Sequence, residues 1–270
     1  MPADFGGRLI YIIQEYWLSF LQGAGRTMVI AIISTILGCV IGFAVGIVQS
    51  LPVNKNDNII KRILMKIVRF ILAAYVEVFR GTPMMVQAMF IYYGIPLVFG
   101  VHLGMWPAAL LIVSINTGAY MAETVRGGIL SIDPGQTEGA KAIGMTHLQT
   151  MVNVILPQAL RNIIPQIGNN LIINIKDTCV LSVIGTIELF YTTKGIAGAF
   201  YTYFEAFTVT MVIYFVLTFT CSRLLRLWEN KLDGPDSYDL ATTDTLAHTS
   251  GMAGVPKSLV NSNDNTRESL

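Results

Sequence analysis

The sequence predicts an all-α membrane protein with five transmembrane helices, and two observations carry this prediction. Hydrophobic residues make up 53% of the 270 residues and charged residues 13%, whereas about 25% of residues are charged in an average soluble domain. In addition, residues 27–54 and 81–122 contain no Asp, Glu, Lys or Arg. Both runs are longer than the ~20 helical residues that cross a hydrocarbon core.

Apolar segments predict where the membrane is crossed. The fifth, at residues 206–222, is slightly short at ~25 Å, and the apolar residues after it extend it while Arg223 and Arg226 reach the interface. The five predicted spans are residues 27–49, about 70–96, 106–122, 163–186 and 206–222.

The distribution of basic residues predicts an external N-terminus and a cytoplasmic C-terminus, because short cytoplasmic loops are enriched in Lys and Arg. The predicted external side carries only Arg8, Arg26 and Lys194. The basic residues of the predicted cytoplasmic side are Lys55, Lys61, Arg62, Lys66, Arg69, Arg126, Lys141, Arg161, Arg223, Arg226 and Lys231.

Two flanking segments are predicted to lie outside the membrane core. Residues 1–23 contain the aromatic and apolar stretch Leu9 to Leu21, interrupted by Gln14 and Glu15, which is typical of an external interfacial helix. Residues 233–270 hold six acidic and two basic residues and a single aromatic residue, a composition that predicts a disordered cytoplasmic tail. A regulatory role for this tail is the alternative.

Small residues recur at every fourth position of the first span. Ser34, Gly38, Gly42 and Gly46 form this row, and small residues at such spacing let the backbone of another helix approach closely. The row predicts that the first span packs inside a helix bundle.

Composition and motifs exclude several other functions. The net charge of +1, with no basic face, argues against nucleic-acid binding. Three cysteines and three scattered histidines match neither a disulfide framework nor a metal site. The chain also lacks the GxxxxGK[ST] loop that cradles nucleotide phosphates, so we expect neither a metal nor another cofactor on this chain.

The segment between the third and fourth spans is too long for a simple connection. Asp133 is a good N-cap and Pro134 suits the first helical position, so a short helix is predicted from there to Gly144, a C-terminal stop. Thr146 is predicted to cap a second helix that continues until Pro157 disturbs it. Two such helices form a rigid projection for a partner protein or, alternatively, a surface re-entrant hairpin.

The same segment resembles the EAA loop of ABC-importer permease subunits. The matching residues are Glu138-Gly139-Ala140, Gly144 and Val154-Ile155-Leu156-Pro157, in which Gly139 replaces an Ala and Val154 an Ile. Three further runs resemble signatures of the polar-amino-acid branch of this family. These runs are residues 75–83, 116–123 and 176–185, and the resemblance covers about residues 24–232.

The resemblance implies a type I ABC importer permease in a bacterial cell membrane, with residues 24–232 as its transmembrane domain. Hydrolysis of ATP, with Mg, would take place on a separate dimer of ATPase subunits, so this chain is not itself an enzyme. The implied further partners are an extracellular substrate-binding protein, a second permease copy or paralogue, membrane lipid, and a polar amino acid such as glutamine, arginine or histidine. The implied ATPase contacts on the 133–157 loop are Glu138, Ala140, Gly144, Leu156 and Pro157.

Polar residues within the spans supply candidates for the substrate pathway, since such residues usually face a cavity or one another. The spacing of Glu77 and Arg80 predicts a structural charge pair on one helical face, and Glu123 and Arg126 repeat it. Carboxylates, a cation and amides suit the ammonium and carboxylate of an amino acid, although a structural role is the alternative. The pathway candidates are Asn116, Glu123, Asn170, Lys176 and Asp177.

Two prolines are interpreted as structural: Pro83 is predicted to disturb a helix and Pro165 to begin one.

The main rival function is a self-sufficient secondary transporter or channel, which the absence of an evident inverted repeat disfavours. An intramembrane enzyme is disfavoured by the absence of GxSxG and HExxH motifs. A membrane scaffold for a cytosolic partner is the remaining alternative.

Overall fold

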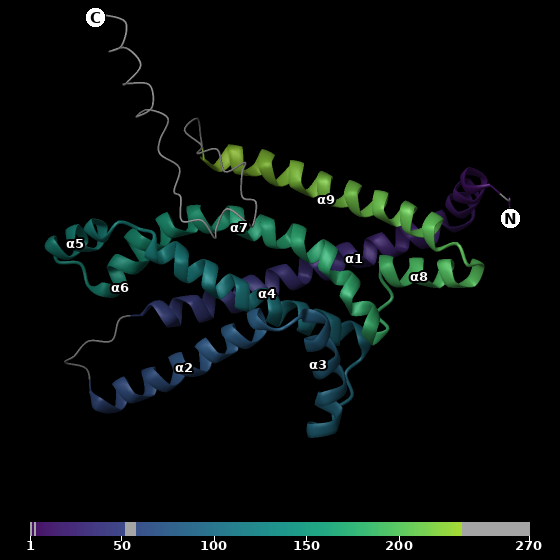
Figure 1. The fold of residues 1–270 in the computed structure, drawn as a ribbon. Coiled ribbons are helices and arrows are strands. Elements are labelled where there is room, and N and C mark those ends of the chain that lie inside the picture. Colours follow the sequence, from purple (N-terminus) through teal and green to yellow (C-terminus); the bar gives the residue numbers. More distant parts are fainter. Residues whose placement is uncertain (1, 3, 52–57, 234–270) are drawn as a thin grey trace, which may run out of the picture. The chain divides into compact units, whose positions relative to one another are not determined.

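A computed structural model describes residues 2, 4–51 and 58–233, and all contacts discussed below lie within residues 1–229, which cluster as one unit (Figure 1). Every regular element in these ranges is helical. The elements are α1 (Phe5–Ser50), α2 (Ile59–Gly81), α3 (Met84–Phe99), α4 (Met105–Leu130), α5 (Pro134–Ala142), α6 (His147–Thr150), the π-helical turn Met151–Ile155, α7 (Leu156–Asp177), the 3₁₀ helix Thr178–Ile184, α8 (Leu189–Phe200) and α9 (Tyr203–Asp233). The tail predicted over residues 233–270 lies outside the described residues, apart from Asp233.

The pairing of α1 with α4 forms the centre of the bundle (Figure 1). A Cβ atom added at Gly42 would overlap Met121 of α4, and one added at Gly46 would lie 2.8 Å from the carbonyl oxygen of Ala122. The two backbones therefore approach so closely that only glycine fits between them. The predicted close packing of the glycine row is confirmed.

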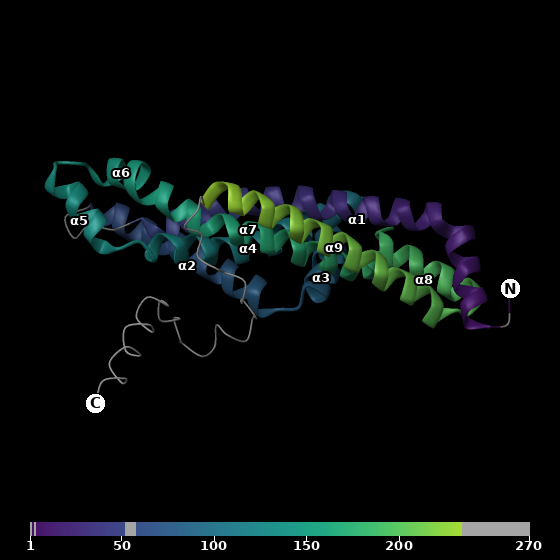
Figure 2. The same cartoon turned by 90° about the horizontal axis from the view of Figure 1, so that it is seen from above.

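The N-terminal segment and the first predicted span form one helix of 46 residues. Asp4 caps this helix by accepting a hydrogen bond of 2.7 Å from the amide of Gly7, and no break occurs at residue 23. Figure 2 shows the first turns of α1 bending away from its main axis. Near this end, Ile12 and Phe20 are buried in one apolar cluster with residues of α8 and α9. The interfacial position of residues 1–23 stays a prediction.

The second predicted span is in fact two helices, because α2 ends at Gly81 and α3 begins at Met84. Pro83 has no amide hydrogen and disfavours a helical conformation at Thr82, which is extended. The side-chain amide of Gln87 then donates hydrogen bonds of 2.9 Å to the carbonyl oxygens of Phe79 and Thr82. The predicted disturbance at Pro83 is confirmed, and it divides the predicted span at about residues 70–96 into two helices.

The fourth predicted span also starts differently. Helical structure is continuous from His147 to Ile184, and Pro165 lies inside α7 rather than at its beginning. Proline is tolerated within membrane helices where neighbouring groups satisfy the freed backbone carbonyl. The interpretation of Pro165 as a helix start is therefore wrong.

Three described helices are long and apolar enough to cross a membrane, namely α1, α4 and residues 203–229 of α9. Residues 147–184 and α8 add a fourth crossing if this pair, bent by 55°, is one span, and α3 is a shorter apolar helix. The count of five spans and their orientation stay predictions.

The contact between α1 and α4 predicts a large effect from one added methyl group. Gly42→Ala is expected to lower the free energy of unfolding by about 1–3 kcal/mol, because the methyl group overlaps Met121. Gly25→Ala is the matched control in the same helix, since no atom lies within 4 Å of its added Cβ, and it is expected to stabilise by up to about 1 kcal/mol. Denaturation in detergent measures both, and equal effects would contradict the packing argument.

Candidate functional site

The first half of the 133–157 loop is a capped helix with a sharp end. The carboxylate of Asp133 accepts a hydrogen bond of 2.6 Å from the amide of Gly135, and Pro134 begins α5. The helix ends at Ala142, and Gly144 follows with a left-handed φ of +84°. The amide of Met145 bonds back to the carbonyl of Ala140 at 3.1 Å. The predicted cap and glycine stop are confirmed.

The second half of the loop leads directly into the bundle. Thr146 and Gln149 form a reciprocal capping box at the start of α6. The chain then makes a π-helical turn, and Pro157 lies in the first turn of α7. Since the wider turn accommodates a residue without an amide hydrogen, the helix continues past Pro157. The predicted disturbance at Pro157 is thus a π turn and not an end.

The predicted ATPase contacts differ in exposure. Glu138, Gly144 and Pro157 are exposed, Leu156 is half-buried, and Ala140 is only 6% exposed. Three large apolar side chains that were not singled out as contacts are also exposed on this loop: Ile143 at 80%, Leu148 at 69% and Val152 at 51%. Together with the exposed Glu138, these three side chains give the loop accessible apolar and acidic residues, which we call the loop surface.

Hydrogen bonds brace the loop against α7. The side-chain amide of Gln158 donates to Gln136 at 3.3 Å and to the carbonyl of Val154 at 2.8 Å. The side-chain amide of Asn162 donates to the hydroxyl of Ser131 at 3.2 Å. These bonds tie both arms of the loop to one helix, so the loop surface is presented by a rigid support.

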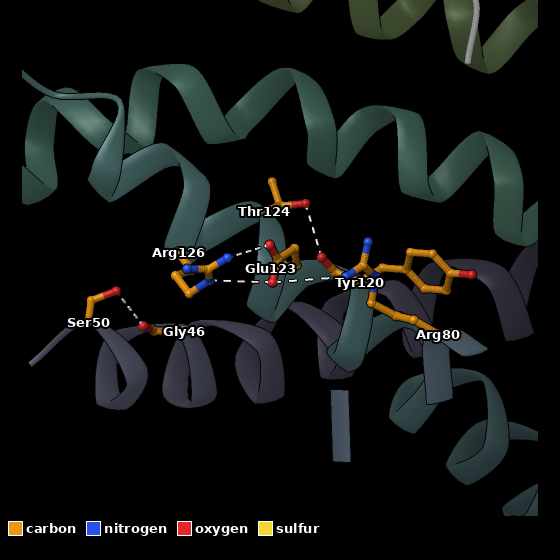
Figure 3. A network of polar contacts seen from close by, with 7 residues as sticks. All are labelled: Gly46, Ser50, Arg80, Tyr120, Glu123, Thr124 and Arg126. Carbon is orange, nitrogen blue, oxygen red and sulfur yellow. Dashed lines mark hydrogen bonds and ion pairs between the residues drawn. The ribbon is translucent and has the colours of Figure 1, made fainter. Parts of the chain in front are cut away.

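A second polar site lies where α1, α2 and α4 meet, and Figure 3 shows its charges. Arg126 pairs with Glu123 at 2.7 Å, as the spacing predicted, while Arg80 approaches the other oxygen of Glu123 at 3.9 Å and lies over the ring of Tyr120. The pair predicted between Glu77 and Arg80 is absent from the described ion pairs, because Arg80 reaches across to α4 instead. One carboxylate thus serves two guanidinium groups.

A cavity of about 260 Å³ opens beside these charges. Its lining comes from three helices and carries both charge signs. Within the described chain, Glu77 has no hydrogen-bond or ion-pair partner, and the Nε atom of Arg69 is buried without one. The lining residues of this polar cavity are Gln49, Arg69, Ala73, Val76, Glu77, Glu123 and Arg126.

Of the five pathway candidates, only Glu123 lines the polar cavity. The side-chain amide of Asn116 donates to Gln87 at 2.9 Å, and that of Asn170 donates to the carbonyl of Gln166 at 2.9 Å. Lys176 is exposed and Asp177 half-buried at the end of α7. These four residues stay candidates, but the structure does not bring them to Glu123.

Three lining residues were missed as candidates for the substrate pathway. The sequence analysis does not predict Gln49 or Arg69 as pathway residues, and it assigns Glu77 to a structural pair with Arg80. The signal was the spacing of Arg69, Ala73, Val76 and Glu77, which places these residues on one face of α2. Recognising it requires knowing which face of α2 meets α4.

Comparison with known proteins identifies the family to which this chain belongs. Residues 59–233 match the family described as the binding-protein-dependent transport system inner membrane component. The chain belongs to this family. The family, the all-α fold and the multi-pass membrane location expected from the sequence are therefore confirmed.

Relatives match nearly their whole length. The glutamine transport system permease protein of Escherichia coli strain K12 is 34% identical over 213 residues, which cover 78% of this chain and 92% of the relative. A putative glutamine transport system permease protein of Rickettsia typhi is 32% identical over 226 residues, which cover 83% of this chain and 98% of the relative.

Solved structures agree with these relatives. A chain from the crystal structure of an amino acid ABC transporter with histidines has a TM-score of 0.73 at 34% identity, covering 86% of this chain and all of that one. A chain from an inward-facing methionine ABC transporter has a TM-score of 0.60 at 21% identity, covering 79% of this chain and 97% of that one. At this identity the similarity supports a shared fold only.

The left-handed turn at Gly144 predicts a local effect. Gly144→Ala is expected to weaken the loop by about 1–2 kcal/mol, because φ of +84° crowds any Cβ. Gly139→Ala is the matched control: its Cβ meets no atom within 4 Å, and the change favours α5 by about 0.5–1 kcal/mol. Amide hydrogen exchange over residues 139–146 is expected to be faster in the first variant and slower or unchanged in the second. Faster exchange in Gly139→Ala than in Gly144→Ala would show that a side chain at position 144 does not strain the turn.

Proposed function

We propose that this permease imports a polar amino acid and that separate ATPase subunits drive it through the loop surface. Family membership supports transport with a binding protein, and both relatives described above are named for glutamine. The observation that carries the ATPase proposal is the braced 133–157 loop with its exposed apolar residues. An extracellular binding protein and a second permease copy or paralogue complete the proposed assembly.

The loop surface has the properties of a docking surface. Ile143, Leu148 and Val152 offer apolar area, and Glu138 adds a charge that can specify one orientation. Ala140 is buried and Leu156 half-buried, so we assign them the role of positioning the loop rather than contacting the ATPase. Gly144 is needed for the turn that exposes Ile143.

The polar cavity is the proposed place of amino-acid contact. Arg69 offers an unpaired donor to a carboxylate, and Glu77 offers an unpaired carboxylate to an ammonium group. Glu123 is already shared by Arg80 and Arg126, so we assign it the role of holding the cavity's shape and charge. A free amino acid carries both complementary charges.

Reconstituted transport tests ATP coupling. Liposomes that contain this permease with its ATPase and binding protein are expected to take up radiolabelled amino acid only with ATP. Glu138→Lys is expected to abolish uptake because it reverses the charge of the loop surface. Gly144→Asp is also expected to abolish uptake, because the new side chain distorts the turn. Gly139→Ala is the control and is expected to keep uptake.

The amounts of inserted permease are measured in the same vesicles, so that a loss of uptake is not confused with a loss of protein. Wild-type uptake by Glu138→Lys would contradict docking through this surface. Uptake by this chain alone under an ion gradient would favour the secondary transporter instead.

Direct binding tests the polar cavity. Glu77→Gln and Arg69→Gln are each expected to weaken equilibrium binding of radiolabelled amino acid to the purified permease by roughly 10–100-fold, because each removes a charge-assisted hydrogen bond. Glu15→Gln, an exposed carboxylate of α1 outside the cavity, is the control and is expected to bind as wild type. Unchanged affinity in both cavity variants would place the amino acid elsewhere, and a panel of glutamine, arginine and histidine would identify the preferred substrate.

A further inference from the structure

The N-terminal half of α2 carries a basic groove, of which the proposed transport function uses only Arg69. The groove has a volume of about 490 Å³ and is lined by Ile59, Arg62, Ile63, Lys66 and Arg69. The three cations are separated by four and three residues and therefore share one helical face. None of the described lining residues is acidic, and in the described chain no ion pair involves these three side chains. The groove thus has a strong positive charge without an internal counter-charge.

An apolar stripe borders the three cations on the same helical turns. It consists of Ile59, Ile63 and Phe70, which are separated by four and seven residues and share one helical face, and their exposed fractions run from 55% to 75%. A stripe of this kind suits the boundary between headgroups and acyl chains. The groove thus combines cations with exposed apolar residues that can meet a lipid.

Arg69 connects the groove to the bundle. Its Nε atom is buried without a hydrogen-bond partner among the described residues, and its side chain lines both the basic groove and the polar cavity. A guanidinium group presents several donors in a plane that suits a phosphate oxygen. A buried donor of this kind is costly unless a ligand satisfies it.

The groove is also at the end of the bundle that carries the loop. The N-terminal end of α2 lies at the same end as α5 and α6, opposite the N-terminus of the chain (Figures 1 and 2). Basic residues are concentrated on the cytoplasmic side of membrane proteins, where the leaflet carries anionic lipids.

We propose that the basic groove binds the phosphate of an anionic phospholipid headgroup in the cytoplasmic leaflet. Arg62 and Lys66 contact the phosphate, Arg69 lies where the groove meets the polar cavity, and the exposed apolar stripe lies beside the acyl chains. The apolar stripe favours a lipid over a soluble anion, because a soluble anion would gain nothing from it. The proposal does not depend on which amino acid is transported.

The test uses the full-length chain in a neutral detergent, titrated with fluorescent phosphatidylglycerol and with phosphatidylcholine of the same acyl chains. Wild type is expected to bind phosphatidylglycerol at least tenfold more tightly. Arg62→Gln/Lys66→Gln is expected to weaken that binding roughly thirtyfold, and high salt is expected to weaken it in the wild type. These two residues lie outside the polar cavity, so failure here is distinguishable from failure of the transport proposal.

Arg223→Gln/Arg226→Gln removes the same charge from α9 and is the matched control, with binding expected within twofold of wild type. Equal loss in this control would show that net charge alone is responsible and would overturn the proposal. Unchanged binding in the α2 variant would overturn it too, as would displacement of the lipid by millimolar inorganic phosphate, which indicates a soluble-anion site. If the double variant aggregates, Lys66→Gln decides, with an expected loss of roughly fivefold.

Discussion

The close contact between α1 and α4 is the constraint on which the rest of the structure depends. Gly42 and Gly46 let the backbone of α1 touch α4 at Met121 and Ala122. Gln49 follows Gly46 by less than one helical turn, and Glu123 follows Ala122 directly, so the same contact brings both to the polar cavity. Figure 3 shows Gly46 and Ser50 beside the pair of Glu123 with Arg126. A wider separation of the two helices would move Gln49 away from Glu123 and Arg126 on the opposite wall.

Polar side chains inside the bundle divide into two groups by their hydrogen bonds. Asn174 donates to Thr35 at 2.7 Å and to Thr117 at 3.0 Å, which joins α7 to α1 and α4. Asn116 and Gln87 join α4 to the break between α2 and α3. Because unpaired polar groups are costly in hydrocarbon, these saturated clusters are best understood as structural.

Arg69 and Glu77 differ from those clusters because the described chain leaves them without partners on the wall of a cavity. Buried hydroxyl groups of Ser114, Thr186 and Thr202 are also without a partner in the described chain, so a missing partner alone does not mark a ligand site. Arg69 and Glu77 are distinguished because they line one cavity and carry opposite charges. This pair of charges suits a ligand that carries both complementary charges.

Features set by nearby residues could be predicted from the sequence, and features set by the opposite helix could not. The cap at Asp133, the turn at Gly144 and the pair of Glu123 with Arg126 each involve residues within one or two turns, and all are present. Arg80 was assigned to Glu77 by the same local rule, but Glu123 on α4 competes for it across 43 positions of sequence. The membership of Gln49 and Arg69 in the polar cavity likewise depends on helix packing, which spacing alone does not encode.

The loop and the polar cavity are mechanically joined through α4 and α7. One apolar cluster contains Met121, Val125 and Ile129 of α4 together with Ile155, Ala159 and Ile163 from the end of the loop and from α7. The bond from Asn162 to Ser131 closes the same connection at the base of the loop. Since packed interiors transmit displacement rather than absorb it, a force on the loop surface must move α4 and α7 together. Glu123 and Arg126 lie between Met121 and Ile129 on α4, so this movement reaches one wall of the cavity directly. The other wall, on α2, is coupled to α4 through the hydrogen bond of 2.6 Å from the hydroxyl of Tyr75 to the carbonyl of Ile115 and through the ion pair of Arg80 with Glu123. Under the proposed docking, closure of an ATPase on the loop would therefore act on the cavity through α4, and α2 would respond through these contacts.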